Sequence, residues 1–348
     1  MAPASRDGAV AGGRVPVLLT RRISFLGGKG GVGKTTIAAS AALSVADAGQ
    51  RTLLVSTDPA HSTSDVLQMQ LGSDVRPVTR NLYALELDPE REAERYISDV
   101  KNRLAEAIPP RLVAEVERQI DVAQVSPGAA EAALFERFAR VLDGSADYDR
   151  VIFDTAPTGQ TLRLLGLPET MNIWMSGLIQ RRRKVSALGK MWRNVAGASA
   201  GGDSGETQVG SAGNRGGTAD ADAVLTALEQ RRDRFVRARA LLTDDAQTSF
   251  LFVLTPQRLP ILETARAVST LRKYDIPVGG VIVNQVEPAA DSGPGAPMRT
   301  VRKNEFLETI ETEFAEIPRW LVPRMEEEVV GLAALRELGG MMKAESTP

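Results

Sequence analysis

The sequence predicts an α/β fold, a doubly wound and mostly parallel sheet with a helical insertion subdomain. Short apolar runs rich in β-branched residues alternate with helical patterns along much of the 348-residue chain. Runs that are apolar at nearly every residue are typical of strands buried on both faces, as in a parallel sheet covered by helices. The length and a hydrophobic content of 43% allow either two small domains or one large domain with an insertion.

Six of these apolar runs are predicted to be strands of the sheet. They lie at about residues 22–26, 51–56, 82–87, 150–154, 250–255 and 278–284. The residues ahead of the first run are rich in Ala and Gly, and they predict a flexible N-terminus over 1–20. The α/β core is therefore expected to consist of residues 21–88, 143–168 and 245–340.

The helical insertion subdomain is expected at residues 89–142 and 169–244. In its second part, apolar side chains recur at helical spacing and form one stripe, with a basic run from Arg181 to Lys184 near its middle. We interpret the stripe either as the core-facing side of a helix or as an exposed surface for a hydrophobic client. Residues 196–221 are mostly small or polar and predict a disordered loop. The stripe consists of Met171, Trp174, Met175, Leu178, Ile179, Val185 and Trp192.

Composition excludes several classes of function. The chain has no cysteine, which excludes disulfides, iron–sulfur clusters and thiolate nucleophiles, and its single histidine, His61, disfavours a transition-metal site. A formal net charge of -2 creates no overall field toward nucleic acid or acidic lipid. No apolar run reaches the roughly 18–20 residues of a membrane span, and no secretory leader is recognisable. We therefore expect a cytoplasmic protein with no integral membrane segment and no nucleic-acid partner.

A glycine-rich loop directly follows the first predicted strand and precedes an Ala-rich helical pattern. Its sequence, GGKGGVGKTT, contains the phosphate-loop pattern G-x-x-x-x-G-K-[ST]. Backbone N–H groups of such a loop turn inward around phosphate oxygens, and the helix N-terminus adds partial positive charge. Lys34 is predicted to contact the β- and γ-phosphates of ATP, and the Thr35 hydroxyl to bind Mg²⁺. The predicted nucleotide contacts are Gly28, Gly30, Gly31, Val32, Gly33, Lys34, Thr35 and Thr36.

Lys29, a second lysine early in this loop, resembles the additional lysine of the deviant Walker A proteins. In those proteins the residue reaches across a dimer interface to the nucleotide of the partner. The resemblance implies that the chain is a homodimer during catalysis and that Lys29 is catalytic. The alternative interpretation is a solvated lysine in an exposed loop.

Two acidic residues at the carboxyl ends of predicted strands complete the predicted site. Asp58 lies in the segment STDPAHSTSD after the second strand, and Asp154 ends the apolar strand RVIFD. Open α/β sheets bind ligands at this edge. Asp58 is predicted to orient the water that attacks the γ-phosphate, and Asp154 to hold Mg²⁺ as a Walker B residue. Both are predicted metal ligands together with Thr35, while the structural alternatives are an Asx turn at Asp58 and an Asp cap at Asp154.

These motifs together resemble the ArsA family, which comprises the arsenite-pump ATPases and the ATPases that target tail-anchored membrane proteins. The resemblance rests on GGKGGVGKTT, STDPAHSTSD and above all DTAPTGQTLR, and it spans about residues 22–338. It implies a P-loop ATPase that binds ATP and Mg²⁺. It also implies an adenine pocket in which Asn284 contacts the base and the loop of Pro323 and Glu326 covers it.

Three departures from the family pattern affect the expected function. Gln160 stands where the second switch usually carries His. No cysteine is present to bind trivalent arsenic, so a thiolate-gated arsenite response is excluded. The Cys-x-x-Cys zinc clasp of the eukaryotic targeting dimers is absent too, so the dimer must be held in another way.

The leading prediction is a homodimeric nucleotide switch. It couples ATP binding and hydrolysis to the binding of a hydrophobic, tail-anchored-like client helix or of a membrane-protein partner. One alternative is an ATPase subunit that energises a membrane anion pump of the arsenite type. Another is a positioning ATPase of the MinD and ParA kind, which shares the deviant loop but does not typically show the DTAPTG-x-TLR switch.

Overall fold

The computed structural model describes residues 19–58, 62–88, 129–155, 216–287 and 296–344, and a few positions between 90 and 102. The chain divides into two compact units. The first consists of Met1–Pro89, Ser145–Arg163 and Leu241–Pro348, and the second of Glu90–Gly144 and Leu164–Ala240. The sheet and the phosphate loop belong to the first unit.

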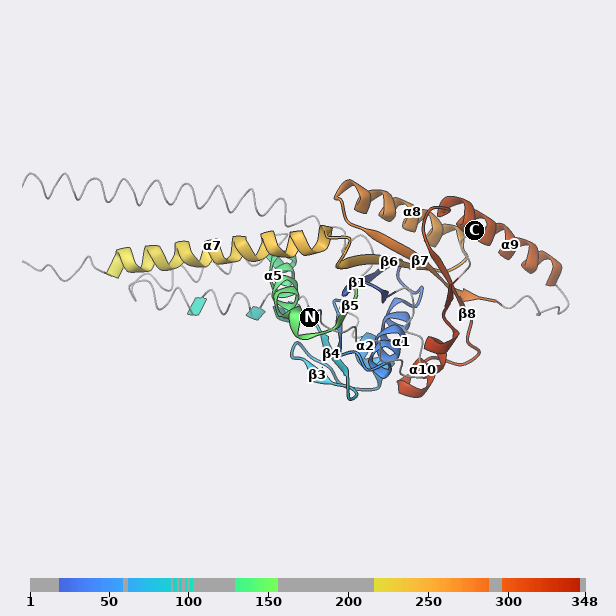
Figure 1. Ribbon diagram of the computed structural model, residues 1–348, viewed down its shortest axis with the longest axis horizontal. Coiled ribbons are helices and arrows are strands. Elements are labelled where there is room, and N and C mark those ends of the chain that lie inside the picture. The colour runs from blue at the N-terminus through green and yellow to red at the C-terminus, as the bar shows by residue number, and fades with distance from the viewer. Residues whose placement is uncertain are drawn as a thin grey trace, which may run out of the picture. The chain divides into compact units, whose positions relative to one another are not determined.

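Within the described residues, nine strands of the first unit form one sheet in the order β3-β4-β2-β5-β1-β6-β7-β8-β9 (Figure 1). The seven inner strands run parallel, and the two-residue strands β3 and β9 pair antiparallel at the edges. The predicted α/β class with a mostly parallel sheet is therefore confirmed. The strands are β1 Ile23–Gly27, β2 Thr52–Ser56, β3 Arg76–Pro77, β4 Leu82–Glu86, β5 Arg150–Asp154, β6 Thr248–Leu254, β7 Val278–Val286, β8 Arg319–Pro323 and β9 Lys343–Ala344.

All six predicted strands are present, with ends that differ from the predicted ones by at most two residues. The sequence analysis did not predict β3, β8 and β9. β3 and β9 are too short to show a periodic pattern. In β8, buried residues alternate with half-buried ones, because this strand lies next to the edge of the sheet. It therefore lacks the continuous apolar run of the inner strands.

Three helices pack on one face of the sheet, α1 Lys34–Asp47, α2 Ser62–Leu67 and α10 Gly331–Met341 (Figure 1). α1 is buried on most sides because it lies between the sheet and α10. The two helices approach closely, since a Cβ at Gly339 of α10 would collide with the Ser44 hydroxyl of α1. Arg336 also donates two hydrogen bonds to Asp47, of 2.7 and 3.1 Å. This packing holds α1, and with it the helix N-terminus that the phosphate loop enters.

The opposite face of the sheet carries α8 Arg258–Lys273 and α9 Ala296–Glu313 (Figure 1). Phe25 of β1 stacks on Phe153 and Phe250 of the neighbouring strands, with ring centroids 4.6 and 5.7 Å apart. Side chains of a strand alternate between the two faces, so Leu26 and Ile152 join the core around α1 instead. Both faces of the central strands are therefore buried, as their apolar sequences predict.

The second unit contains α5 Ala129–Asp143 and most of α7 Gly216–Thr243. Phe135 of α5 and Phe235 of α7 are fully buried, and their rings meet edge to face with centroids 4.9 Å apart. This contact holds the two helices together through apolar surface.

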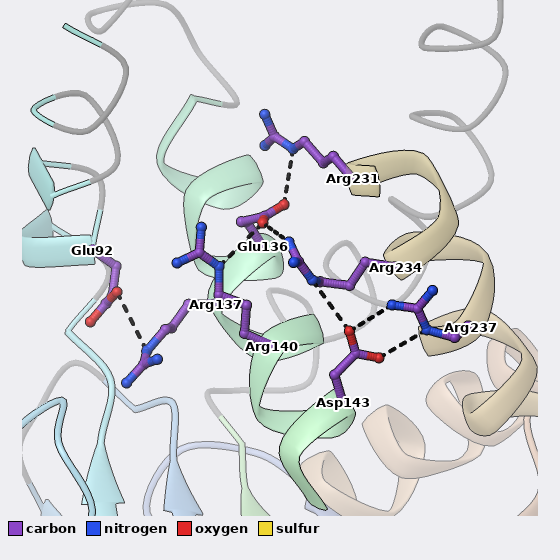
Figure 2. Close-up of polar contacts among 8 residues, drawn as sticks. All are labelled: Glu92, Glu136, Arg137, Arg140, Asp143, Arg231, Arg234 and Arg237. Carbon is purple, nitrogen blue, oxygen red and sulfur yellow. Dashed lines mark hydrogen bonds and ion pairs between the residues drawn. The ribbon is translucent and has the colours of Figure 1, made fainter. Parts of the chain in front are cut away.

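A cluster of ion pairs also links α5 and α7 (Figure 2). The buried Glu136 carboxylate of α5 pairs with Arg231 of α7 at 2.9 Å, with Arg140 at 3.3 Å, and also with Arg234. About two turns further along α5, Asp143 pairs with Arg237 of α7 at 2.9 Å. A buried carboxylate is tolerated when it is paired in this way. The ion pairs therefore join α5 to α7.

α7 begins at Gly216, inside the segment 196–221 that the sequence analysis expects to be a disordered loop. Residues 216–221 are helical, which corrects that expectation. An established helix extends at the gain of one hydrogen bond per residue, so α7 continues through Gly216 and Gly217 despite the low helix propensity of glycine. The apolar stripe at 171–192, Gln160 and the rest of the predicted loop lie outside the described residues. In the part of the chain that the structure describes, no helix has both the length and the apolar character that a membrane crossing requires.

Candidate functional site

The phosphate loop leads from β1 into the N-terminus of α1. Gly33 precedes the helix in the left-handed conformation, with φ 88° and ψ 27°. No described side chain caps this N-terminus, and the first turn of α1 contains no acidic residue. The free N–H groups of a first turn and the helix dipole together attract anions. The N-terminus of α1 is therefore suited to bind a phosphate group.

Close contacts leave no room for a side chain at Gly28 and Gly33 of the loop. A Cβ at Gly28, whose φ is 151°, would collide with the carbonyl oxygen of Val253 in β6. A Cβ at Gly33 would collide with the Asn284 side-chain amide, which donates a 2.8 Å hydrogen bond to the carbonyl of Val32. The loop is thus held against β6 and β7. At Gly30 and Gly31 an added Cβ would meet nothing within 4 Å.

Lys34 is the first residue of α1 and is only 5% exposed. Its ammonium group donates a 3.2 Å hydrogen bond to the carbonyl of Lys29, so the side chain curls back over the loop. Burial lowers the pKa of Lys34, and the carboxylates of Asp154 and Asp58 oppose that shift. The site therefore holds a largely desolvated cation beside the uncapped helix N-terminus.

Asp154, at the end of β5, is fully buried. Burial raises its pKa to about 7, and Asp58 adds to the rise, while Thr35, Lys34 and Thr63 oppose it. The Thr63 hydroxyl donates to Oδ2 at 3.5 Å, whereas Oδ1 has no hydrogen-bond partner among the described residues. A buried acceptor without a partner favours protonation of the carboxyl group or binding of a cation.

The oxygens around Asp154 fit a Mg²⁺ ion. The Thr35 hydroxyl lies 3.0 Å from the hydroxyl of Ser62 and close enough to Asp154 to lower its pKa. Mg²⁺ prefers such oxygen donors and usually takes one or two carboxylates, with water and substrate phosphate in its other positions. The unpartnered Oδ1 of Asp154 and the Thr35 hydroxyl could therefore hold the cation.

Asp58 lies two residues after the end of β2, where Ser56 pairs with Asp154 of β5. Its backbone N–H donates to the Ser56 hydroxyl at 3.3 Å, and the preceding Thr57 N–H donates to the carbonyl of Asp154 at 2.9 Å. The Asp58 carboxylate is close enough to change the pKa of both Asp154 and Lys34. The structure thus brings together Lys34, Thr35, Asp58 and Asp154, as the sequence analysis expects. Residues 59–61, with His61, lie outside the described residues.

Lys29 points to α8 of its own chain. Its ammonium group lies 3.3 Å from the Glu263 carboxylate, and both side chains are partly exposed. An exposed ion pair of this kind contributes about 0–1 kcal/mol. The pair is therefore weak enough for Lys29 to exchange Glu263 for another anion.

A cavity of 250 Å³ opens beside the start of α1. Gly33 and Thr36 line it on one side, and Asn284 of β7 and Pro323 at the end of β8 on the other. Glu326, which the sequence analysis includes in this site, does not line the cavity; the residues on either side of it do. The segment after Pro323 is irregular. The sequence shows where it lies, but its backbone dihedral angles decide which of its side chains face the cavity. The remaining lining residues are Gln285, Arg324, Met325, Glu327, Glu328, Val329 and Leu338.

Three polar residues of this region were missed by the sequence analysis as site residues. Ser62 and Thr63 begin α2 and contact Thr35 and Asp154. Glu86 ends β4 and is buried. The signal that singled out Asp154, an acidic residue at the carboxyl end of a buried strand, applies equally to Glu86.

Comparisons with known proteins agree with this geometry. The ArsA_ATPase family of anion-transporting ATPases matches residues 21–344. A putative arsenical pump-driving ATPase of Aquifex aeolicus is 33% identical over 318 residues, which cover 91% of this chain and 97% of that protein. ATPase ASNA1 homolog 1 of Paramecium tetraurelia is 30% identical over 328 residues, 93% of each chain. ATPase GET3B of Arabidopsis thaliana is 30% identical over 345 residues, 92% of this chain and 79% of that protein.

Proposed function

Because the chain belongs to the ArsA family and is an ATPase, we propose that it is a Mg²⁺-dependent homodimeric switch. ATP binding and hydrolysis control its binding of a hydrophobic, tail-anchored-like client helix or of a membrane-protein partner. The proposal includes a cytoplasmic location, as the sequence predicts. The observation that carries its central part, the binding of Mg²⁺ and ATP, is the buried Asp154 with an unpartnered oxygen, beside Lys34 and the uncapped N-terminus of α1.

Each residue of the site has a role in hydrolysis under this proposal. Lys34 and the N–H groups of the phosphate loop neutralise the β- and γ-phosphates. Thr35 and Asp154, with Asp58 close by, would hold Mg²⁺, which would supply positive charge against the negative charge that develops on the phosphate oxygens. Asp58 orients the attacking water and accepts its proton. The cavity beside Asn284 has a volume of 250 Å³, less than the roughly 300–1,000 Å³ of sites that hold a whole ligand. We therefore assign it to one part of the nucleotide, the adenine base.

Lys29 supports the homodimer part of the proposal. In the single chain its partner is Glu263, and a nucleotide phosphate of a second subunit offers a stronger charge-assisted contact. We expect wild type to sediment as a dimer with a slow-hydrolysing ATP analogue, and Lys29→Ala to stay monomeric and to lose hydrolysis. Glu263→Gln, which frees the same lysine, is the matched control and should dimerise as wild type. Dimerisation and hydrolysis of Lys29→Ala at wild-type levels would contradict the role in the partner's site.

The client part of the proposal rests on the apolar stripe at residues 171–192 and on the relatives named as ASNA1 and GET3 ATPases. If the stripe lines a client groove, Leu178→Asp should leave the thermal melt and basal ATPase activity nearly unchanged and abolish capture of an apolar helix. If the stripe is core, the same change buries an unpaired charge and should unfold the insertion, because such burial costs several kcal/mol. A melt and a client pull-down on this variant therefore separate the two interpretations, and a large drop in melting temperature would refute the groove.

A second candidate is an ATPase that energises a membrane anion pump, which the name of the Aquifex aeolicus relative favours. One experiment distinguishes it from the client switch: purification of the hydrolysis-blocked Asp58→Asn protein from its own cells. The client switch predicts that proteins with an apolar C-terminal helix co-purify. Co-purification of a membrane permease instead would favour the pump.

A further inference from the structure

Three adjacent strands bring a row of polar residues together at the carboxyl edge of the sheet. In the parallel register Asp154 of β5 lies beside Ser56 of β2, and Ser56 lies beside Glu86 of β4. Residues paired in this register point to the same face of the sheet. Two strand spacings of about 4.8 Å place the backbones of Glu86 and Asp154 roughly 10 Å apart. Glu86 therefore lies two strands away from Asp154, on the same edge as the site.

The Glu86 carboxylate is directed at the start of α2. The residue is only 3% exposed. One carboxylate oxygen accepts a 3.3 Å hydrogen bond from the Thr63 N–H, and the other a 2.7 Å hydrogen bond from the Ser64 hydroxyl. An anion at a helix N-terminus satisfies N–H groups that have no intrahelical partner and interacts favourably with the helix dipole. A residue of β4 thus anchors α2 from outside the helix.

The same turn of α2 contacts the metal site. The Thr63 hydroxyl donates to Asp154 at 3.5 Å, and the Ser62 hydroxyl lies 3.0 Å from that of Thr35. Thr63 therefore bridges the two carboxylates, with its N–H on Glu86 and its hydroxyl on Asp154. A shift of α2 would move both hydroxyls away from the predicted ligands of Mg²⁺.

The segment that carries Asp58 is fastened at both ends. At its start, the Thr57 N–H donates to the Asp154 carbonyl at 2.9 Å. At its end, Thr63 is held by Glu86. Five residues, 58–62, lie between these two anchors, so the freedom of the Asp58 backbone depends on both. Loss of the Glu86 anchor would leave this second end held by fewer contacts, those of the Ser62 and Thr63 hydroxyls.

We propose that Glu86 is a positioning residue for ATP hydrolysis. It touches neither nucleotide nor cation; it holds the start of α2, so that Asp58 and the Ser62 and Thr63 hydroxyls remain in their reactive arrangement. This inference rests on the proposed function, because it assigns Glu86 to the site in which Asp58 orients the attacking water.

Glu86→Gln tests the inference. Glutamine keeps the shape but offers one acceptor and one NH₂ donor, whereas the Thr63 N–H and the Ser64 hydroxyl both donate to the carboxylate. We expect kcat to fall about 10- to 100-fold, since small displacements of reacting groups cost that much. The KM for ATP and the affinity for a slow-hydrolysing analogue should stay within about threefold, because the phosphate loop is untouched. Hydrogen exchange of the α2 amides should become faster, a readout independent of turnover.

Glu136→Gln is the matched control, since Glu136 is an equally buried carboxylate in the second unit. It should lower the melting temperature and leave kcat unchanged. If Glu86→Gln does not fold, Ser64→Ala removes the hydroxyl that donates to Glu86 and should show the same pattern with a smaller loss of kcat. Wild-type kcat in a folded Glu86→Gln protein, or a rise in KM without a fall in kcat, would overturn the inference. Failure of the proposed function would give a different result from failure of this inference. If the nucleotide site itself were wrong, ATPase activity would survive Lys34→Ala.

Discussion

Replacing Lys34 with alanine should abolish tight ATP binding and ATP turnover. Lys34 is the buried cation at the start of α1, and the proposed site directs its ammonium group to the β- and γ-phosphates. Hydrogen bonds to charged groups contribute about 1.5–3 kcal/mol each, so the loss of two of them should weaken binding at least about 100-fold. Equilibrium binding of a fluorescent ATP analogue and a phosphate-release assay measure both effects.

The fold should survive this change. Burial is the main cause that lowers the pKa of Lys34, which means that folding desolvates this ammonium group. Its removal should therefore cost little stability, and the melting temperature of Lys34→Ala without nucleotide should stay near that of wild type. Lys273→Ala, which removes a lysine at the C-terminal end of α8, is the matched control and should keep full activity. Undiminished ATPase activity in Lys34→Ala would mean that the nucleotide site lies elsewhere.

Replacing Asp58 with asparagine should keep ATP binding and slow hydrolysis by about 10²–10⁴-fold, the usual contribution of a positioned general base. The substitution removes the group that orients water but leaves Lys34 and the phosphate loop intact. It also removes a negative charge that raises the pKa of Asp154, so that pKa should fall. Single-turnover measurements on pre-bound ATP separate the slowed step from any change in affinity.

Asp65→Asn serves as the control for this variant, because Asp65 is exposed on α2, seven residues along the chain. It should hydrolyse ATP at the wild-type rate. A large loss of ATP affinity in Asp58→Asn, with normal turnover of the ATP that is bound, would make Asp58 a binding residue instead of the base.

Short-range patterns made part of the fold and site predictable. The phosphate loop is a run of ten consecutive residues whose backbone conformation depends on its own glycines, and the strand before it and the helix after it lie where the motif requires them. The inner strands are continuous apolar runs, because both of their faces are buried. Asp154 was recognisable because an acidic residue ends one of these runs.

Contacts between distant segments limited the prediction elsewhere. Glu86 and Thr63 are 23 positions apart, and nothing in either segment alone indicates that one anchors the other. The pairing of Lys29 with Glu263 depends on how α8 packs against the sheet. Which residues after Pro323 line the cavity depends on backbone dihedral angles that have no periodic signature.

By itself, the sequence determined the α/β class, the phosphate loop and the two strand-end aspartates, because each depends on spacing within about ten residues. Only the tertiary structure decided that Asp154 is fully buried with one unpartnered oxygen and a pKa raised to about 7. It also decided that Glu86 and Asp154 hold the two sides of Thr63. The physical reason is that desolvation and hydrogen-bond partners arise from the packing of β2, β4, β5 and α2 together, and no single one of these segments carries that information.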